Sequence, residues 1–271
     1  MTRATELRAQ FLELHIAPPE SPTPGTLVMP NPWDVGSAKL LVDRGALALA
    51  TTSSGHAGSH GRLDQNVDRG ELLSHVDELT RSVDVPFNVD AEDCFADDVD
   101  GVAESARLIA STDAAGFSIE DYDPRADAIR PVEVAAAHVS AAKEAGGDLV
   151  LTARAENLLY GVDDLDDTIA RLVAYRAAGA DVVYAPGLMS ASDIEQVVDA
   201  VSCPVNVLAI PGTPTVPELA ALGVARVSVG GLFAWAAYGA LVSAADELLG
   251  AGTSAYATRA LSGEIRDRIF A

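Results

Sequence analysis

Short apolar runs alternate with longer amphipathic stretches from residue 27 almost to the C-terminus. A run of four to eight apolar residues bounded by turn residues is typical of a buried parallel strand. A stretch with apolar residues every three to four positions is typical of a helix. The pattern predicts eight strands, each rich in Val, Leu, Ala or Ile, at residues 27–30, 46–52, 86–90, 116–120, 149–153, 181–185, 204–209 and 226–229.

Helix-like segments separate these strands, and several of them end at a glycine, which is a common stop signal for a helix. Eight strands with intervening helices predict an α/β protein with a (β/α)₈ TIM barrel, as one domain over residues 1–271. A doubly wound open sheet is the competing fold. We expect accessory helices at about 3–15 and 254–270, a loop at 18–24, and barrel helices near 36–43, 69–83, 98–111, 131–145, 163–178, 190–201, 216–222 and 232–249.

Composition narrows the class of protein further. Hydrophobic residues make up 49% of the 271 residues but aromatics only 5%, so aliphatic side chains must fill the core. The formal charge of -22 argues against binding to nucleic acid or to an anionic membrane surface. Two cysteines cannot build a disulfide framework, and no run of about 18 uninterrupted apolar residues is present. We therefore expect a cytoplasmic protein.

Polar residues follow the predicted strands at their carboxyl ends, where barrels collect functional groups. The third strand leads into Asp90 and Glu92, the fourth ends at Glu120, the fifth at Arg154, and the seventh holds Asn206. Mg²⁺ is commonly held by one or two carboxylates together with waters and substrate. Asp90 and Glu92, two apart on an extended strand, would share one face. The alternative is a solvated acidic turn without a metal.

Carboxylates that converge with one arginine suit a small anion bridged by a metal ion. Arg154 can grip a carboxylate through two parallel hydrogen bonds, and Mg²⁺ can polarise the carbonyl of a 2-oxo acid. Such an arrangement stabilises an enolate formed when a neighbouring bond to carbon or phosphorus breaks. The small residues at 53–55 would leave backbone amides free for a second anionic group, unless they form only a flexible polar loop.

Two further residues each allow a functional and a purely structural interpretation. His56 follows the presumed anion-binding loop and is a candidate general acid, or a loop histidine without a catalytic role. Trp33, at the end of the first strand, is a candidate for the pocket floor or for simple packing.

In this order and spacing, several short segments resemble the isocitrate lyase and phosphoenolpyruvate mutase superfamily. The resemblance covers nearly the whole chain and rests on residues 31–38, 51–55 with Asp64 downstream, 89–93, 119–121, 153–156, 174–175, 178–181 and 222–228. It implies a (β/α)₈ barrel, often a tetramer with the last helix exchanged between subunits. It also implies Mg²⁺, or Mn²⁺ in its place, acting on 2-oxo or 2-hydroxy acids.

The resemblance also implies roles for individual residues. Asp90 corresponds to the closest metal ligand, and the further ligands, or holders of metal-bound water, are Asp64, Glu92 and Glu120. Arg154 corresponds to the substrate-binding arginine. The segment that binds a substrate carboxylate or phosphonate corresponds to Ser53, Ser54 and Gly55.

The chain departs from the family in the loop after the fourth strand. The lyases carry Lys-x-Cys-Gly-His there, with the cysteine as an acid, whereas residues 122–127 contain no cysteine. Pro186 stands where the mutase has a histidine. The proton donor is therefore unassigned.

The resulting prediction is a Mg²⁺-dependent lyase that cleaves or forms a carbon–carbon bond in a 2-oxo or 2-hydroxy (di)carboxylic acid, as a homo-tetramer or dimer. The catalytic candidates are Arg154, Glu120 and His56, and the substrate-binding candidates are Ser53, Ser54, Gly55, Arg154, Asn206 and Trp33. Alternatives are a carbon–phosphorus mutase, a hydrolase of phosphonopyruvate or oxaloacetate type, and a metabolite-binding barrel without turnover. A phosphate-binding barrel using residues 230–231 is a further alternative.

Overall fold

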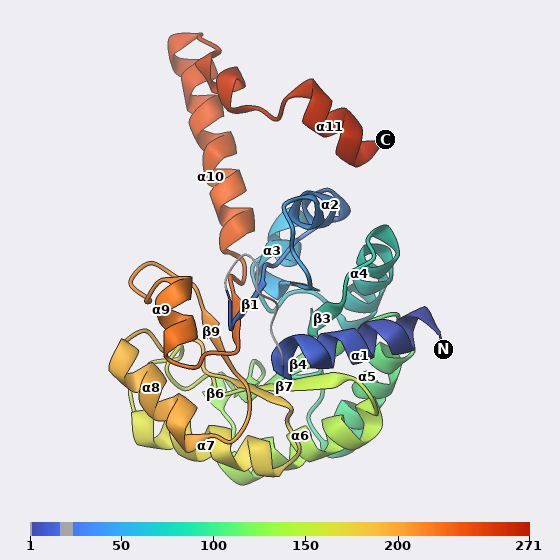
Figure 1. Ribbon diagram of the computed structural model, residues 1–271, viewed down its shortest axis with the longest axis vertical. Coiled ribbons are helices and arrows are strands. Elements are labelled where there is room, and N and C mark those ends of the chain that lie inside the picture. The colour runs from blue at the N-terminus through green and yellow to red at the C-terminus, as the bar shows by residue number, and fades with distance from the viewer. Residues whose placement is uncertain (1, 17–23) are drawn as a thin grey trace.

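The computed structural model describes residues 2–16 and 24–271 and shows a (β/α)₈ barrel (Figure 1). This confirms the predicted fold over the open sheet. The parallel strands follow the order β1-β10-β9-β8-β7-β4-β3-β2, and the predicted loop at 18–24 lies almost wholly outside the described residues. The strands are β1 (Leu27–Met29), β2 (Leu49–Ala50), β3 (Phe87–Asp90), β4 (Gly116–Glu120), β7 (Val150–Arg154), β8 (Val182–Tyr184), β9 (Val205–Leu208) and β10 (Arg226–Ser228).

The side chain of Asn31 helps to close the barrel where β1 and β2 meet, beside a backbone hydrogen bond from Ala50 N–H to the Pro30 carbonyl at 3.1 Å. Asn31 donates from Nδ2 to the carbonyl oxygen of Thr51 at 2.9 Å, just beyond β2. Its Oδ1 accepts from the backbone N–H groups of Val229 and Gly230, at 2.9 and 3.0 Å, just beyond β10. An amide can donate and accept at once, so Asn31 joins the carboxyl ends of three strands at the seam.

The outer helices lie within two or three residues of their predicted positions, because the sequence marks where most of them begin. An Asp side chain accepts a backbone N–H at the start of α2, α4, α5 and α7, as expected of a helix cap. The helices around the barrel are α2 (Val35–Asp43), α4 (Arg69–Ser82), α5 (Val99–Ala110), α6 (Val132–Gly146), α7 (Leu165–Ala177), α8 (Ala191–Ala200), α9 (Val216–Ala221) and α10 (Leu232–Asp246).

The interior of the barrel is polar toward the carboxyl ends of its strands, whereas an apolar cluster fills it near their amino ends. Side chains alternate between the two faces of a strand. On β4, Phe117 and Ile119 join the large apolar cluster beneath the helices, and Ser118 lies between them. On β7, Leu151 joins the same cluster, whereas Thr152 contacts the buried Arg226. Most of the aliphatic core therefore lies between strands and helices, and the space inside the strands near their carboxyl ends is left for polar groups.

Helix α1 (Arg3–Ile16), predicted at about 3–15, covers the amino ends of the strands. Its Leu7 and Phe11 pack with Leu27 and Met29 of β1 in a separate apolar cluster. His15, near its end, bonds through Nδ1 to the Phe11 carbonyl at 2.7 Å. Because α1 closes the barrel at the amino ends of the strands, the barrel opens at their carboxyl ends.

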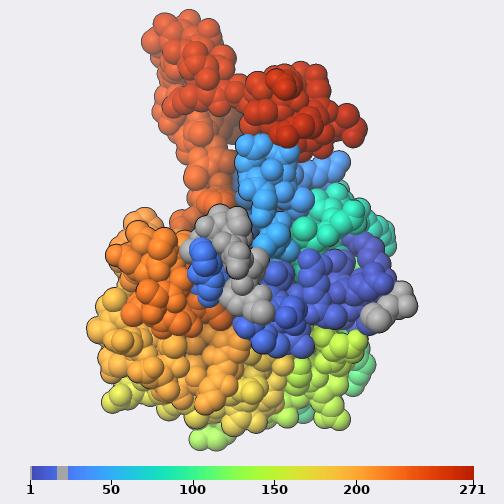
Figure 2. Space-filling view, viewed as in Figure 1, coloured from blue at the N-terminus to red at the C-terminus, as the bar shows by residue number. Residues whose placement is uncertain are grey.

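The C-terminal region leaves the body of the barrel. Helix α10 continues as a π-helical turn (Glu247–Ala251) and projects away from the other elements (Figures 1 and 2). The predicted single helix at 254–270 is wrong: the structure has a 3-10 turn (Ala255–Arg259) and a separate α11 (Gly263–Phe270), which Ser262 caps. Helix α11 returns to α2, where Arg268 pairs with Asp43 at 3.0 Å.

Most of α10 is exposed although it is apolar. Leu241 is 64% exposed and Val242 59%. By length and composition alone, Leu232–Ala251 is long enough to cross a membrane, a test that helices of soluble proteins also pass. An apolar surface of this size calls for a covering partner.

Two buried histidines should make stability depend on pH. Burial lowers the pKa of His15 to about 3, with Arg226 adding to the effect, and burial lowers that of His75 to about 3. The unfolded chain takes up these protons near pH 6.5 and the folded protein does not, so the unfolding free energy falls between pH 6.5 and 3. Each histidine contributes a slope of up to about 1.4 kcal/mol per pH unit. Urea unfolding at pH 7.5 and at pH 5 measures this decrease in unfolding free energy. The decrease should be smaller in His75→Gln, and a decrease as large as that of the wild type would contradict the assignment.

Candidate functional site

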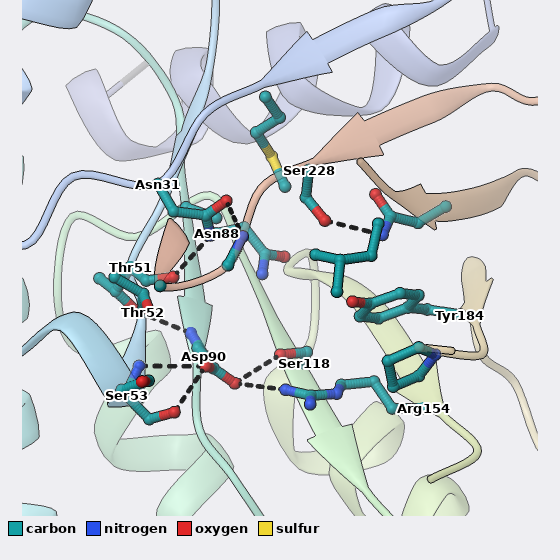
Figure 3. A pocket seen from close by; sticks show the side chains of 18 of the residues that line it. Asn31, Thr51, Thr52, Ser53, Asn88, Asp90, Ser118, Arg154, Tyr184 and Ser228 are labelled. Atoms are coloured by element: carbon teal, nitrogen blue, oxygen red, sulfur yellow. Dashed lines mark hydrogen bonds and ion pairs between the residues drawn. The ribbon is translucent and has the colours of Figure 1, made fainter. Parts of the chain in front are cut away.

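A cavity of about 230 Å³ opens at the carboxyl ends of the strands (Figure 3). Its wall draws on both the polar barrel interior and the loops that follow the strands. Six predicted site residues lie together in its lining: Ser53, Ser54, Asp64, Asp90, Arg154 and Asn206. The structure thus brings residues from widely separated parts of the chain to one small space.

Asp90, the last residue of β3, is held from three sides. Its Oδ2 accepts from both the backbone N–H and the hydroxyl of Ser53, each at 3.1 Å. Its Oδ1 accepts from Nη1 of Arg154 at 2.7 Å, and the hydroxyl of Ser118 lies 3.4 Å away. The backbone N–H of Asp90 donates to the Thr51 hydroxyl at 2.8 Å. These contacts fix the carboxylate in the cavity wall.

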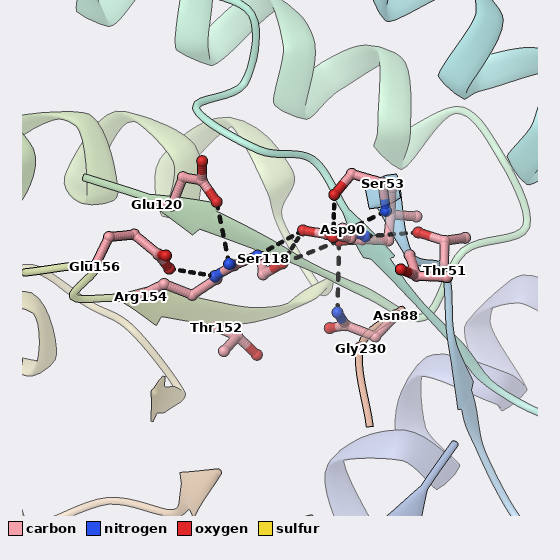
Figure 4. Close-up of polar contacts among 12 residues, drawn as sticks. Thr51, Ser53, Asn88, Asp90, Ser118, Glu120, Thr152, Arg154, Glu156 and Gly230 are labelled. Atoms are coloured by element: carbon pink, nitrogen blue, oxygen red, sulfur yellow. Dashed lines mark hydrogen bonds and ion pairs between the residues drawn. The ribbon is translucent and has the colours of Figure 1, made fainter. Parts of the chain in front are cut away.

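Arg154, at the end of β7, contacts three carboxylates at once (Figure 4). Besides Asp90, it reaches Glu120 from Nη2 at 3.2 Å and Glu156 from Nε at 2.7 Å. The ring of Tyr184 lies 5.4 Å from the guanidinium carbon. Burial alone would lower the pKa of this guanidinium, but the three carboxylates raise it well above its ordinary value. Arg154 is therefore permanently charged.

Acidic groups outnumber basic groups around Arg154. Burial raises the pKa of Glu92 to about 8, with Asp90 and Asp64 adding to the shift. Burial also raises the pKa of Glu120 well above its usual value. Asp64 is exposed at the rim, yet the surrounding protein and the charge of Asp90 raise its pKa. Five carboxyl groups thus share one guanidinium, and their ionised forms lack a counter-charge.

This donor set fits a hard divalent cation. Mg²⁺ prefers oxygen ligands, keeps several waters and takes only one or two carboxylates directly. Among residues 2–16 and 24–271, no three His, Cys, Asp or Glu side chains converge closely enough to enclose a metal ion by themselves. The carboxylates that could hold such a cation, directly or through water, are those of Asp90, Asp64, Glu92 and Glu120.

Several predicted site residues lie elsewhere than expected. Glu92 does not share a strand face with Asp90, because β3 ends at Asp90 and Glu92 adopts a left-handed conformation with φ of 48° in the following turn. Residues 53–55 are not a loop but begin the short helix α3 (Ser53–Ser59). Gly55 and Trp33 pack against each other outside the cavity lining, where a Cβ on Gly55 would lie 3.1 Å from the Trp33 Cβ.

The structure does not bring His56 to this cavity. Its ring stacks on His75 at a centroid distance of 3.7 Å and lies 4.6 Å from that of His60. These three histidines line a separate cavity between α3 and α4. Burial lowers the pKa of His56, which therefore stays neutral. Helix α3 turns this side chain away from Asp90.

The sequence analysis missed four contacting residues. Gln65 donates to Glu120 at 2.9 Å, Glu156 pairs with Arg154, and the ring of Tyr184 and the buried Arg226 line the cavity. Tyr184 and Arg226 share the inward face with their neighbours in register, Arg154 and Asn206, but each lies on a strand of only three residues, too short for period-two alternation to mark that face in the sequence.

A short hairpin stands where lyases of this type carry their cysteine loop. Strands β5 (Tyr122–Asp123) and β6 (Ala128–Ile129) pair antiparallel after β4. Both Arg125 and Arg130 hold the base of the hairpin through Asp93. Cys94 cannot replace the missing thiol, because it is fully buried and burial raises its pKa.

Substituting Glu120 tests the charge excess. We expect Glu120→Gln to raise the unfolding free energy by about 0.5–2 kcal/mol at pH 8 without metal, the usual gain from relieving a strained functional site. A carboxyl group whose pKa is raised by folding destabilises the folded protein only at pH values above its pKa in the unfolded chain, about 4.5 for Glu. The gain in stability from Glu120→Gln should therefore vanish below pH 4.5. The same variant should show a smaller thermal stabilisation by Mg²⁺. Unfolding in guanidinium chloride measures the unfolding free energy. A lower unfolding free energy for Glu120→Gln than for the wild type at pH 8 would contradict the assignment.

Comparison with known proteins agrees with this architecture. Residues 21–249 match the family model described as phosphoenolpyruvate phosphomutase. An uncharacterized protein of Mycobacterium tuberculosis strain H37Rv is 34% identical over 82% of this chain and 86% of its own. The 2-methylisocitrate lyase of Bacillus subtilis strain 168 is 26% identical, over 73% of this chain and 66% of its own.

A crystal structure of a Burkholderia cenocepacia J2315 protein, provisionally described as a lyase/mutase, superposes with a TM-score of 0.93. It is 45% identical, and the match covers 99% of this chain and 97% of that one. The chain belongs to the phosphoenolpyruvate phosphomutase family.

Proposed function

We propose that this protein is a Mg²⁺-dependent lyase that cleaves or forms a carbon–carbon bond in a 2-oxo or 2-hydroxy dicarboxylic acid through an enolate. One observation carries the proposal: three carboxylates pair with the single guanidinium of Arg154 at a small cavity, and desolvation together with the nearby charge of Asp90 raises the pKa of two further acids, Asp64 and Glu92. A protein holds such a costly arrangement only where another cation balances it.

The residues divide into two roles. Asp90 would hold Mg²⁺ directly, and Asp64, Glu92 and Glu120 would hold its waters; Mn²⁺ would fit the same oxygen donors. The bound cation would supply the positive charge that stabilises the enolate. Arg154 supplies the second anchor, because it lines the cavity and presents a planar fork suited to a carboxylate.

Arg154 and Ser53 are preorganised for the substrate by their contacts with Asp90. In the structure both direct their N–H groups at this one carboxylate. When a bound cation balances the charge of Asp90, the side chains of Arg154 and of Ser53, whose hydroxyl also donates to Asp90, can turn to a substrate carboxylate while the backbone stays in place. Tyr184, whose ring lies beside Arg154, stays protonated because burial raises its pKa, and so offers a hydroxyl donor in the same cavity.

The proposal of a carbon–carbon rather than a carbon–phosphorus bond rests on relatives as well as on the site. The name of the Bacillus subtilis relative denotes carbon–carbon cleavage, whereas the matching family model is described by carbon–phosphorus chemistry. A phosphonate mutase or a hydrolase is the second candidate, favoured by that family model. Product analysis by NMR separates a lyase from both, and a barrel that only binds metabolites would yield no product at all.

Replacing Asp90 tests the proposal directly. We expect Asp90→Ala to weaken Mg²⁺ binding at least tenfold and to lower turnover of 2-oxo and 2-hydroxy dicarboxylic acids by a factor of 100 or more, because the direct ligand is lost. Calorimetry with Mg²⁺ and oxalate, a mimic of an enolate, measures the first effect. A substrate screen followed by NMR measures the second.

The matched control is Asp100→Ala, an exposed acid on α5. It should leave Mg²⁺ and oxalate binding unchanged. Unchanged binding and turnover in Asp90→Ala would refute the assigned role, and oxalate binding without any turnover in the wild type would identify a binding protein instead.

We also propose that the exposed face of α10 packs against a second copy of this chain, giving a homo-dimer or tetramer. The helix is apolar, stands clear of the barrel and carries exposed Leu241, Val242 and Leu249. The burial of such residues favours association by about 25 cal/mol per Å² of apolar surface. A partner there would also lie near the site, because the indole of Trp235 donates to the Ser54 hydroxyl at 3.1 Å.

Light scattering tests this assembly. We expect Leu241→Asp to shift the protein from oligomer to monomer, because a charge cannot be buried unpaired in an apolar interface. Leu63→Asp is the matched control, since Leu63 is 80% exposed on the barrel rather than on α10, and it should keep the oligomer. A wild-type monomer at micromolar concentration would contradict the proposal.

A further inference from the structure

The floor of the cavity holds a buried arginine without a carboxylate partner. Arg226, the first residue of β10, is 2% exposed and lines the cavity. Among residues 2–16 and 24–271 no acidic side chain forms an ion pair with it, although the chain has 40 acidic residues and 18 Lys and Arg. Burying an unpaired charge is costly, so its retention at this place calls for an explanation.

The contacts of Arg226 leave donors unused. Its Nε donates to Oδ1 of Asn206 at 2.8 Å and its Nη2 to the hydroxyl of Thr152 at 3.1 Å. Its Nη1 lies 3.1 Å from Nε2 of His15, which accepts because Nδ1 of that ring donates to the Phe11 carbonyl. A guanidinium has five N–H groups, and these contacts occupy three. Two donors and a full positive charge are left without a counter-ion.

A second polar group at the same floor lacks a partner. Asn88, two residues before Asp90 on β3, is 3% exposed and lines the cavity, and its Oδ1 has no hydrogen-bond partner. Rotation of the amide lets Asn88 present either an acceptor or a donor to a ligand. The predicted substrate residue Asn206 also lines the cavity, where it accepts from Arg226 and donates to Ser228 at 2.9 Å.

We propose that Arg226, with Asn88, binds a second anionic group of the substrate at the floor of the cavity. The inference rests on the proposed function, which places the oxo-acid head at Asp90 and Arg154. It deepens that proposal by naming the residues that bind the carboxylate at the end of the dicarboxylic acid remote from the reacting head, which reaches into the barrel interior. Asn206, Thr152 and His15 are positioning residues that hold the guanidinium in place.

Two ligands that differ only at the remote end test the proposal. Malate and lactate share the 2-hydroxy acid head, and malate carries a carboxylate where lactate has a methyl hydrogen. In calorimetry with Mg²⁺ present, we expect the wild type to bind malate at least tenfold more tightly than lactate. Arg226→Met should lose about tenfold to a hundredfold in malate affinity, as for one charge-assisted contact, with lactate and oxalate affinities within twofold.

Two further variants separate recognition from folding. Arg226→Lys keeps the charge and should retain part of the malate preference. Arg130→Met removes a buried arginine that pairs with Asp93 outside the cavity, and should keep the full preference. Failure of oxalate to bind the wild type with Mg²⁺ would refute the proposed function instead. Equal binding of malate and lactate by the wild type, or a preference unchanged in Arg226→Met, would show that Arg226 only fastens α1 to the barrel and would overturn the inference.

Discussion

The attraction between Arg154 and the carboxylates around it is the interaction on which the site depends. One guanidinium contacts Asp90, Glu120 and Glu156, while Asp64 and Glu92 add charge that it cannot balance. Buried charges are costly unless they are paired, and the cation of the proposed function would balance the carboxylates that Arg154 does not. The same arginine orients the acids, which would otherwise repel one another, and thereby keeps the cavity open for a ligand.

The alternation of polar and apolar residues explains much of the fold. Buried strands give compact apolar runs and glycines end the helices, so eight strands were found, most within a residue or two of their observed bounds. Residues 53–55 were interpreted as a loop with free backbone amides, and serine and glycine are poor helix formers that give no helix signal in the sequence. Packing decides there instead: a Cβ on Gly58 would lie 3.1 Å from the Trp235 ring, so only small residues let α3 approach α10. Such tertiary contacts leave no periodic signal.

The site was predictable to the extent that it lies at strand ends. Asp90 and Arg154 follow from where parallel strands stop. The placement of Glu92 did not follow, because a left-handed turn after β3 is set by local packing. His56 was misplaced for a similar reason, since the rotation of a short helix decides which way its side chains point. Arg226 was overlooked because three-residue strands are too short for the alternation that marks an inward face to stand out.

A crystal soaked with Mn²⁺ and oxalate tests the central claim most directly, because anomalous scattering locates the cation without ambiguity. The account predicts one strong peak against the Asp90 carboxylate, waters bridging to Asp64, Glu92 and Glu120, and oxalate in contact with Arg154. An ordered oxalate with no cation beside Asp90, or three carboxylates still clamped on Arg154 at saturating Mn²⁺, would contradict it.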